Sequence, residues 1–193
     1  MSSAGSVEGD ARVRLFCALQ LPNPVLERIV SWQCELPSEG FRLVPRENLH
    51  LTLAFLGHRP AAEVDAVCGA VDEAARPAER IVLRPRLYRE TRSVGMLVFE
   101  DEHGTAGRLA AHLHARLESL GVYEREQRPW LPHLTVVRFR ERPRLRLEPP
   151  ELGAVSPSGA AVYHSVLRPS GARYVVLHSA PLYACRDVGS PET

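Results

Sequence analysis

The segments His50-Leu51-Thr52-Leu53 and His133-Leu134-Thr135-Val136 repeat one pattern, a histidine and a threonine two positions apart in an apolar run. In an extended strand, side chains at positions i and i+2 lie on the same face. Each His and its Thr would therefore face one space, while the residues between them face a core. Two such strands could place two imidazoles and two hydroxyls around one small anion.

The His-x-Thr spacing occurs more often than the composition predicts. The chain has eight histidines in 193 residues, and with its few threonines chance gives about 0.2 occurrences of this spacing. A single copy is best interpreted as a half-buried polar residue in a strand. The matched pair instead favours one shared site.

Bulk composition sets the class of protein. The length of 193 residues, 45% hydrophobic and 24% charged content fit one soluble domain, either compact or made of two lobes. We expect a flexible tail over residues 1–11, a single domain over 12–185 and a second tail over 186–193. The net charge of +1 argues against bulk binding of long nucleic acid and leaves room for a short RNA end.

The sequence shows neither a targeting signal nor closely spaced cysteine pairs. No apolar run approaches the ~20 residues of a membrane span, and the N-terminus lacks a signal-peptide core. We therefore expect a cytoplasmic protein without membrane contacts, and a monomer. The four cysteines form no Cys-x-x-Cys pair, so we interpret them as buried, reduced thiols rather than metal ligands or disulfides.

Hydrophobic periodicity predicts an α+β chain. Three helices are expected: one opened by Pro22-Asn23-Pro24 and ended by Pro37, one after Pro60, and one over residues 105–120 ended by Gly121. The expected strands cover residues 12–21, 42–44, 49–56 closed by Gly57, 81–88, 94–99, 131–139, 161–167 and 173–179. The stretch between the last helix and the final hairpin also includes a Pro- and Arg-rich connection over residues 140–158.

The paired motifs suit metal-independent phosphodiester chemistry. Imidazole titrates near neutral pH, so one His can accept a proton from an attacking water or hydroxyl while the other donates to a leaving oxygen. Threonine hydroxyls can donate hydrogen bonds to phosphoryl oxygens. No carboxylate cluster, His-Glu-x-x-His or Gly-rich phosphate loop accompanies the histidines. We therefore expect no metal and no cofactor.

Three stretches resemble the 2H phosphoesterase superfamily: residues 14–19 (Arg-Leu-Phe-Cys-Ala-Leu), 48–57 (Asn-Leu-His-Leu-Thr-Leu-Ala-Phe-Leu-Gly) and 132–138 (Pro-His-Leu-Thr-Val-Val-Arg). Within it the chain is most similar to the RNA 2′,3′-cyclic phosphodiesterases, also called 2′-5′ RNA ligases. The resemblance implies a bilobal α+β fold, with two pseudo-symmetric lobes of antiparallel sheet and helices around a central cleft. It also implies opening of 2′,3′-cyclic phosphate ends to 2′-phosphates, with reversible 2′-5′ ligation, on RNA ends or nucleoside 2′,3′-cyclic phosphates.

The same resemblance implies roles for single residues. His50 would donate a proton to the departing 3′ oxygen, and His133 would accept the proton of the attacking water. Thr52 and Thr135 would hold the phosphate. Arg138 would bind the phosphate too, provided that the strand ends or bulges before it, because five positions from a His is the wrong parity in a regular strand. 

Aromatic residues complete the expected site. Phe16 could stack on a base or belong to the core. Family members often carry an aromatic residue in the strand that reads Val94-Gly95-Met96-Leu97-Val98 here, and Trp130 is expected to line the cleft entrance instead.

Alternatives remain open from the sequence. The five alternating arginines of residues 138–146 are interpreted as a solvated edge in preference to an RNA-guiding strip. A non-catalytic nucleotide- or RNA-binding module of the same fold is the main alternative function. A His-based metallohydrolase is disfavoured because the carboxylate ligands are missing.

Overall fold

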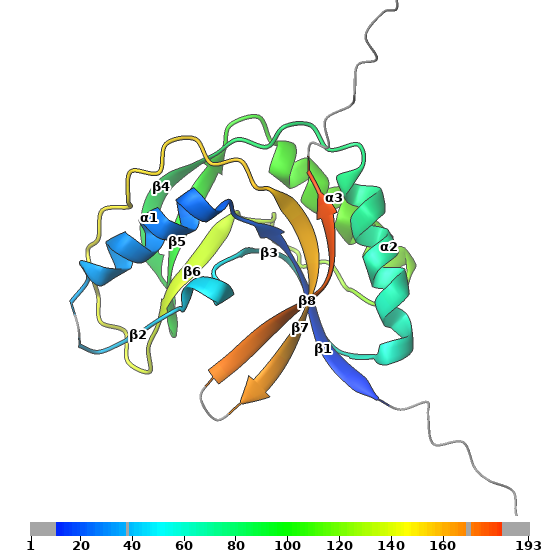
Figure 1. The fold of residues 1–193 in the computed structure, drawn as a ribbon, viewed down its shortest axis with the longest axis horizontal. Helices are drawn as coiled ribbons and strands as arrows, with labels where there is room; N and C mark the ends of the chain where they lie inside the picture. The colour runs from blue at the N-terminus through cyan, green and yellow to red at the C-terminus, as the bar shows by residue number, and fades with distance from the viewer. Residues whose placement is uncertain (1–10, 38, 169–170, 183–193) are drawn as a thin grey trace, which may run out of the picture.

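The protein is an α+β molecule built on one strongly curved antiparallel sheet (Figure 1). The computed structural model describes residues 11–37, 39–168 and 171–182. The sheet order is β4-β5-β6-β3-β1-β7-β8, with β2 attached to β6. The strands are β1 (Arg12–Gln20), β2 (Arg42–Leu43), β3 (Leu51–Pro60), β4 (Leu83–Glu90), β5 (Val94–Asp101), β6 (His133–Arg138), β7 (Gly159–Arg168) and β8 (Gly171–Pro181).

Three helices cover this sheet, namely α1 (Asn23–Cys34), α2 (Val64–Ala75) and α3 (Thr105–Ser119), with short 3-10 turns η1 (Arg46–Asn48) and η2 (Ala61–Glu63). Figure 1 shows α2 and α3 side by side against one half of the sheet and α1 against the other half. Within the described residues, no helix is both long and apolar enough to cross a membrane.

The sheet divides into two lobes at the β3–β6 boundary. These strands pair through Leu51 and Leu134 alone in the described register, whereas β1 pairs with β3 over almost its whole length. One lobe comprises β3, β1, β7 and β8, and the other comprises β4, β5, β6 and β2. The expected bilobal α+β architecture is therefore confirmed.

The lobes share a core. Fully buried residues from both halves, among them Leu15, Leu97, Leu117 and Leu134, belong to one apolar cluster. Burial of this continuous surface is the dominant favourable term holding the two halves together. 

Each motif strand contains a β-bulge immediately after its threonine. In β3, Cys17 faces Ala54 and Ala18 faces Thr52, so Leu53 has no partner in the register. In β6, Gly95 faces Val137 and Met96 faces Thr135, which leaves Val136 unpaired in the same way. A bulge of one residue reverses the alternation of side chains beyond it. 

Several local expectations were wrong. Gly57 does not close β3, which continues to Pro60, because Gly57 adopts a left-handed φ of 69° at a second register shift and pairing with β1 resumes beyond it. Cys34 is exposed, since one step of about 100° along α1 turns it away from the face that buries Ile29 and Gln33. The predicted tails and Cys185 lie outside the described residues, apart from Ala11.

Candidate functional site

A cavity of about 770 Å³ lies where the two motif strands meet. Antiparallel pairing of Leu51 with Leu134 places the centres of the two motifs side by side, so each histidine lies across from the threonine of the other motif. His50, Thr52 and Thr135 line the cavity. His133 lies across this pairing from Thr52 and is half-buried, but it is not among the lining residues.

The two histidines are held in the same way. The Nδ1 atom of His50 lies 2.8 Å from the carbonyl oxygen of Asn48, and the Nδ1 atom of His133 lies 2.9 Å from that of Leu131. A carbonyl can only accept, so this contact fixes the proton on Nδ1 of each neutral ring. It leaves Nε2 of each imidazole as the atom with a lone pair. The two-residue spacing to a backbone carbonyl is thus a common device of both motifs.

An aromatic cluster supports His50. Its ring centroid lies 4.8 Å from that of Phe16, and Tyr174 meets it edge-on at 5.3 Å. Phe16 is itself stacked on Tyr163 at 4.8 Å with an interplanar angle of 4°. Phe16 borders the cavity but is only 3% exposed. Its ring therefore supports His50 and offers little free surface to a base.

Burial lowers the pKa of His50 from its usual value of 6.5 to about 4. The hydrogen bond to the Asn48 carbonyl opposes this shift, and the positive charges of Arg138 and His133 add to it. Desolvation penalises the charged form of an imidazole. His50 is therefore neutral at neutral pH, and it lies close enough to Arg138 and His133 for both to affect its pKa.

Arg138 lines the cavity, and the bulge in β6 is the reason. Val136 and Val137 are consecutive and both fully buried, which shifts Arg138 to the face of Thr135. β3 repeats the arrangement, with Leu53 and Ala54 both buried and Phe55 facing the cavity. Each motif thus presents a third side chain five positions after its histidine.

Phe55 is a site residue that the sequence did not single out. Its side chain is 50% exposed, and the Arg14 guanidinium carbon lies 4.8 Å from the centroid of its ring. The usable signal was the equal spacing of Phe55 from His50 and of Arg138 from His133. An exposed aromatic ring in a cavity is a surface on which a planar group can stack.

The electrostatics of the cavity favour an anion. Its lining includes Arg14, Arg42 and Arg138 and, among the described residues, neither Asp nor Glu. The described part of the chain also contains no group of three or more His, Cys, Asp or Glu side chains placed to hold a metal ion. The arrangement can therefore bind a phosphate by charge and hydrogen bonds and can transfer protons through two imidazoles.

The expected contribution of Trp130 to the cleft entrance is not seen. Trp130 is not among the residues that line the cavity; it packs against the main core and its Nε1 donates to the Thr52 carbonyl at 2.9 Å. It thereby ties the approach to the second motif to the strand of the first. In β5, Phe99 is 2% exposed and belongs to the core, while Met96 pairs opposite Thr135.

Comparisons with known proteins agree with this geometry. Residues 19–88 match the family model of LigT-like phosphoesterases. An RNA 2′,3′-cyclic phosphodiesterase from Thermus thermophilus is 33% identical over 180 residues, covering 88% of this chain and 90% of that protein. The crystal structure of Escherichia coli LigT in its apo form is 26% identical with a TM-score of 0.74, covering 90% of this chain and 99% of LigT.

A second crystal structure of E. coli LigT, complexed with 3′-AMP, is 25% identical with a TM-score of 0.72 over the same shares of the two chains. The identity to the Thermus protein extends over nearly the whole described domain and includes both lobes. The chain therefore belongs to the LigT-like 2H phosphoesterases, the family of the RNA 2′,3′-cyclic phosphodiesterases.

Proposed function

We propose that this protein hydrolyses 2′,3′-cyclic phosphate ends of RNA to 2′-phosphates by proton transfer between His50 and His133. The observation that carries the proposal is the meeting of two His-x-Thr motifs at the Leu51–Leu134 pair, within a cavity lined by arginines. The Thermus relative named an RNA 2′,3′-cyclic phosphodiesterase supports the substrate class. The reaction needs two proton-transfer groups and phosphate-binding donors, and the pairing of the two motifs beside this cavity supports that assignment.

The lowered pKa of His50 supports the opposite assignment of roles to the one that the family resemblance implied. A neutral His50 suits the proton acceptor, so its Nε2 takes a proton from water while the water oxygen bonds to phosphorus. The bond from phosphorus to the 3′ oxygen breaks, and that oxygen leaves with a proton from His133. The product is the 2′-phosphate. With an RNA 5′-hydroxyl in place of water as the nucleophile, the same proton transfers form a bond from phosphorus to the 5′ oxygen and break the bond to the 3′ oxygen, which gives a 2′-5′ linkage.

The remaining lining residues receive supporting roles. Thr52 and Thr135 donate hydrogen bonds to non-bridging oxygens, and Arg138 balances their charge. Phe55 offers its exposed ring to the base, the role first considered for Phe16. 

The deciding assay is hydrolysis of a nucleoside 2′,3′-cyclic phosphate in EDTA, with the 2′- and 3′-phosphate products resolved. We expect the 2′-phosphate to form at an undiminished rate. His50→Ala and His133→Ala should each lower kcat by about 10²- to 10⁴-fold. Thr52→Ala and Thr135→Ala should each lower it by about 100-fold, whereas the Thr→Ser variants keep the hydroxyl and most of the rate.

Two results would favour other functions. A protein that binds the 2′-phosphate product but turns over no cyclic substrate would be a non-catalytic nucleotide- or RNA-binding module. Loss of activity in EDTA, with recovery on adding a divalent metal, would indicate a His-based metallohydrolase.

A further inference from the structure

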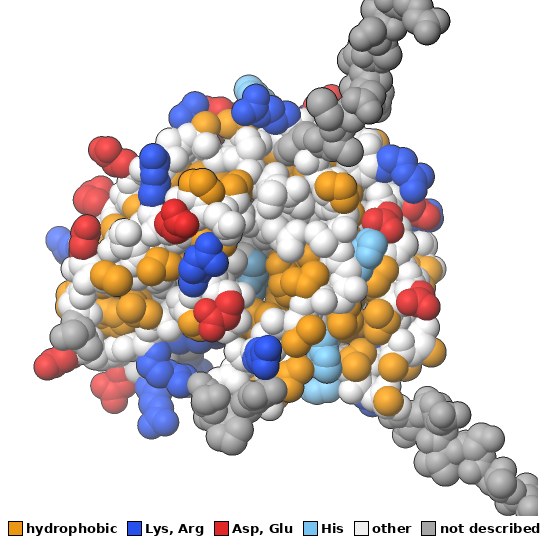
Figure 2. All heavy atoms as spheres, in the orientation of Figure 1, with side chains coloured by type: hydrophobic (Ala, Val, Ile, Leu, Met, Phe, Trp, Pro, Cys, Tyr) orange, Lys and Arg blue, Asp and Glu red, His pale blue; other side chains and the backbone are white. Residues whose placement is uncertain are grey.

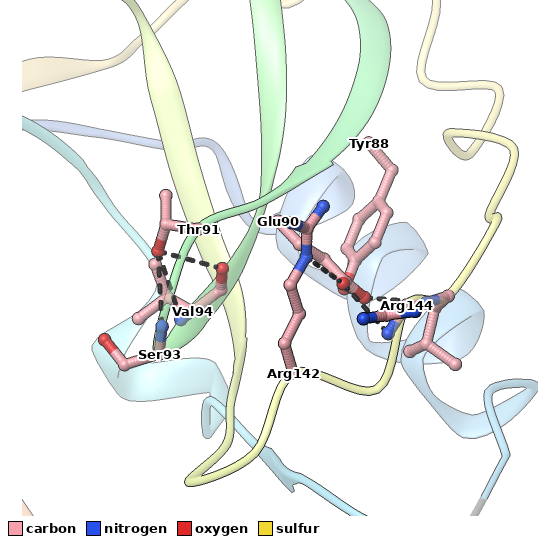
Figure 3. Close-up of polar contacts among 8 residues, drawn as sticks. Tyr88, Glu90, Thr91, Ser93, Val94, Arg142 and Arg144 are labelled. Carbon is pink, nitrogen blue, oxygen red and sulfur yellow. Dashed lines mark hydrogen bonds and ion pairs between the residues drawn. The ribbon is translucent and has the colours of Figure 1, made fainter.

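The loop that follows β6 is anchored by one buried carboxylate (Figure 3). The Glu90 side chain is 2% exposed. It accepts hydrogen bonds from the backbone N–H of Arg144 at 3.0 Å and of Leu145 at 2.8 Å, and from Nε of Arg142 at 3.0 Å. A buried carboxylate is costly unless its lone pairs are satisfied in this way. Glu90 and these three donors are called the Glu90 clamp below.

The clamp determines the path of the loop. Arg144 has a φ of 56°, a left-handed conformation that is unfavourable for a residue with a side chain, so the clamp must offset this cost. Arg142 also neutralises the carboxylate, because its Nε lies against Glu90 Oε2. Arg142 is therefore a structural part of the loop. The five arginines of residues 138–146, which look equivalent in the sequence, have different roles.

The near end of the loop is also held, this time against the β4–β5 turn. Phe139 donates its N–H to the Ser93 carbonyl at 3.0 Å. The turn is closed by Thr91, whose N–H and hydroxyl both reach the Val94 carbonyl, at 2.9 and 3.3 Å (Figure 3). The segment between Phe139 and Arg142 therefore runs between two fixed points.

A third arginine, Arg140, follows two positions after Arg138, which lines the cavity together with Arg42. Arg42 pairs directly opposite Arg138, so both lie on one face of the sheet, and both line the cavity. Phe139 is buried, whereas Arg138 and Arg140 are exposed, and Arg140 lies in the bend that follows the end of β6. Arg42, Arg138 and Arg140 are called the arginine track below.

The arginine track has no internal counter-charge. None of its three arginines makes an ion pair with another described residue, unlike Arg142. Of the neighbouring acids, Glu90 is neutralised, and Glu141 is exposed and adjacent in sequence to Arg140. Figure 2 shows basic side chains gathered at the end of the lobe that contains β2 and β6. A local positive strip on a molecule of net charge +1 is suited to a short anionic chain.

We propose that the arginine track binds the phosphodiester backbone of the RNA strand whose cyclic end occupies the cavity, and that the Glu90 clamp positions Arg140 for this contact. The inference rests on the proposed function and goes further, because it makes the RNA chain, rather than the terminal nucleotide alone, the preferred substrate. Guanidinium groups that follow one another along a surface can contact successive phosphates, and such contacts are independent of base sequence.

The test compares two substrates, a nucleoside 2′,3′-cyclic phosphate and a short single-stranded RNA ending in the same group. Arg140→Gln should lower kcat/KM for the RNA about fivefold at low salt, and reduce the slope of its logarithm against log salt by about 0.7, one phosphate contact on a single strand. For the nucleotide, kcat/KM should change by less than about twofold, because this substrate lacks a second phosphate. Arg28→Gln, an equal charge change on the exposed side of α1, should affect neither substrate.

A second variant separates positioning from general stability. Glu90→Gln should reduce the RNA preference in the wild-type background, but should have no further effect on that preference in the Arg140→Gln background. If Glu90 had a purely structural role, Glu90→Gln would instead lower kcat/KM for both substrates by the same factor in both backgrounds. The proposal for the arginine track would be wrong if Arg140→Gln lowered kcat/KM equally for the two substrates, or for neither.

Failure of the arginine-track proposal can be distinguished from failure of the proposed function. If wild-type protein hydrolyses neither substrate, the cyclic phosphodiesterase proposal fails. The arginine track is then judged by direct binding of an RNA that ends in a 2′-phosphate, measured by fluorescence anisotropy across salt concentrations. Arg140→Gln must weaken that binding and lower its salt slope, and unchanged binding would overturn the track by itself.

Discussion

At the scale of single residues, the protonation state of His50 distinguishes the proton acceptor from the proton donor in the proposed reaction. Burial and the nearby charges of Arg138 and His133 lower its pKa to about 4. A base is active when neutral, so kcat/KM for a nucleoside 2′,3′-cyclic phosphate should fall as the pH drops through about 4 and not near 6.5. Were His50 the proton donor, kcat/KM would instead fall as the pH rises above about 4.

The measurement is a pH–rate profile of kcat/KM, which reports the ionisations of the free enzyme. Arg138→Gln removes one of the positive charges that lower the pKa, so its acid limb should move to higher pH. Arg28→Gln is the charge-matched control and should leave the midpoint in place. Circular dichroism at pH 4 shows whether the protein remains folded at the acid limb.

At the scale of elements, Gln33 of α1 holds the bulge of β6. This side chain is 3% exposed, and its Nε2 donates to the Val136 carbonyl at 2.8 Å and to the Val44 carbonyl at 3.1 Å. Val136 is the extra residue of the bulge. Gln33 therefore joins a helix on the outer side of the sheet to the backbone distortion that places Arg138 in the cavity.

We expect Gln33→Met to lower the free energy of unfolding by about 1–3 kcal/mol, because a similar volume remains but buried carbonyls lose a donor. It should also raise KM for the cyclic nucleotide, since Arg138 loses its fixed position. Ile29→Val, on the same buried side of α1, costs about 1 kcal/mol without touching the bulge. Urea unfolding and steady-state kinetics on both variants test this, and an equal rise in KM in the two would contradict it.

At the scale of the whole molecule, the two lobes should unfold together. Their pairing through β3 and β6 is short, but one apolar cluster includes buried residues of both. Trp130 adds a hydrogen bond to Thr52 at the boundary. Thermal unfolding followed by tryptophan fluorescence, which reports Trp32 in α1 and Trp130 at the boundary, should coincide with unfolding followed by far-ultraviolet circular dichroism.

Two separate transitions would show that the lobes are stable independently and that the cavity between them can open. The monomeric state and the cytoplasmic location stay predictions, and sedimentation equilibrium measures the first of them. 

The sequence by itself determined the fold class and the motif residues. Local alternation of apolar and polar side chains predicts β3 and β6 as strands and puts each His with its Thr on one face, because this relation spans two residues and needs no tertiary contact. Helix periodicity likewise predicts α1, α2 and α3. The predicted end of β3 at Gly57 was wrong because the strand continues to Pro60 through a bulge at this glycine.

Tertiary structure alone decided what joins the motifs. The positions of Arg138 and Phe55 depend on bulges after Thr135 and Thr52, and a bulge is set by pairing with β5 and β1 and by the side chain of Gln33 on a distant helix. The pKa of His50 depends on burial and on charges from β6, 83 to 88 residues further along the chain. The pairing register, bulges and desolvation depend on which distant segments meet, so local spacing could not predict them.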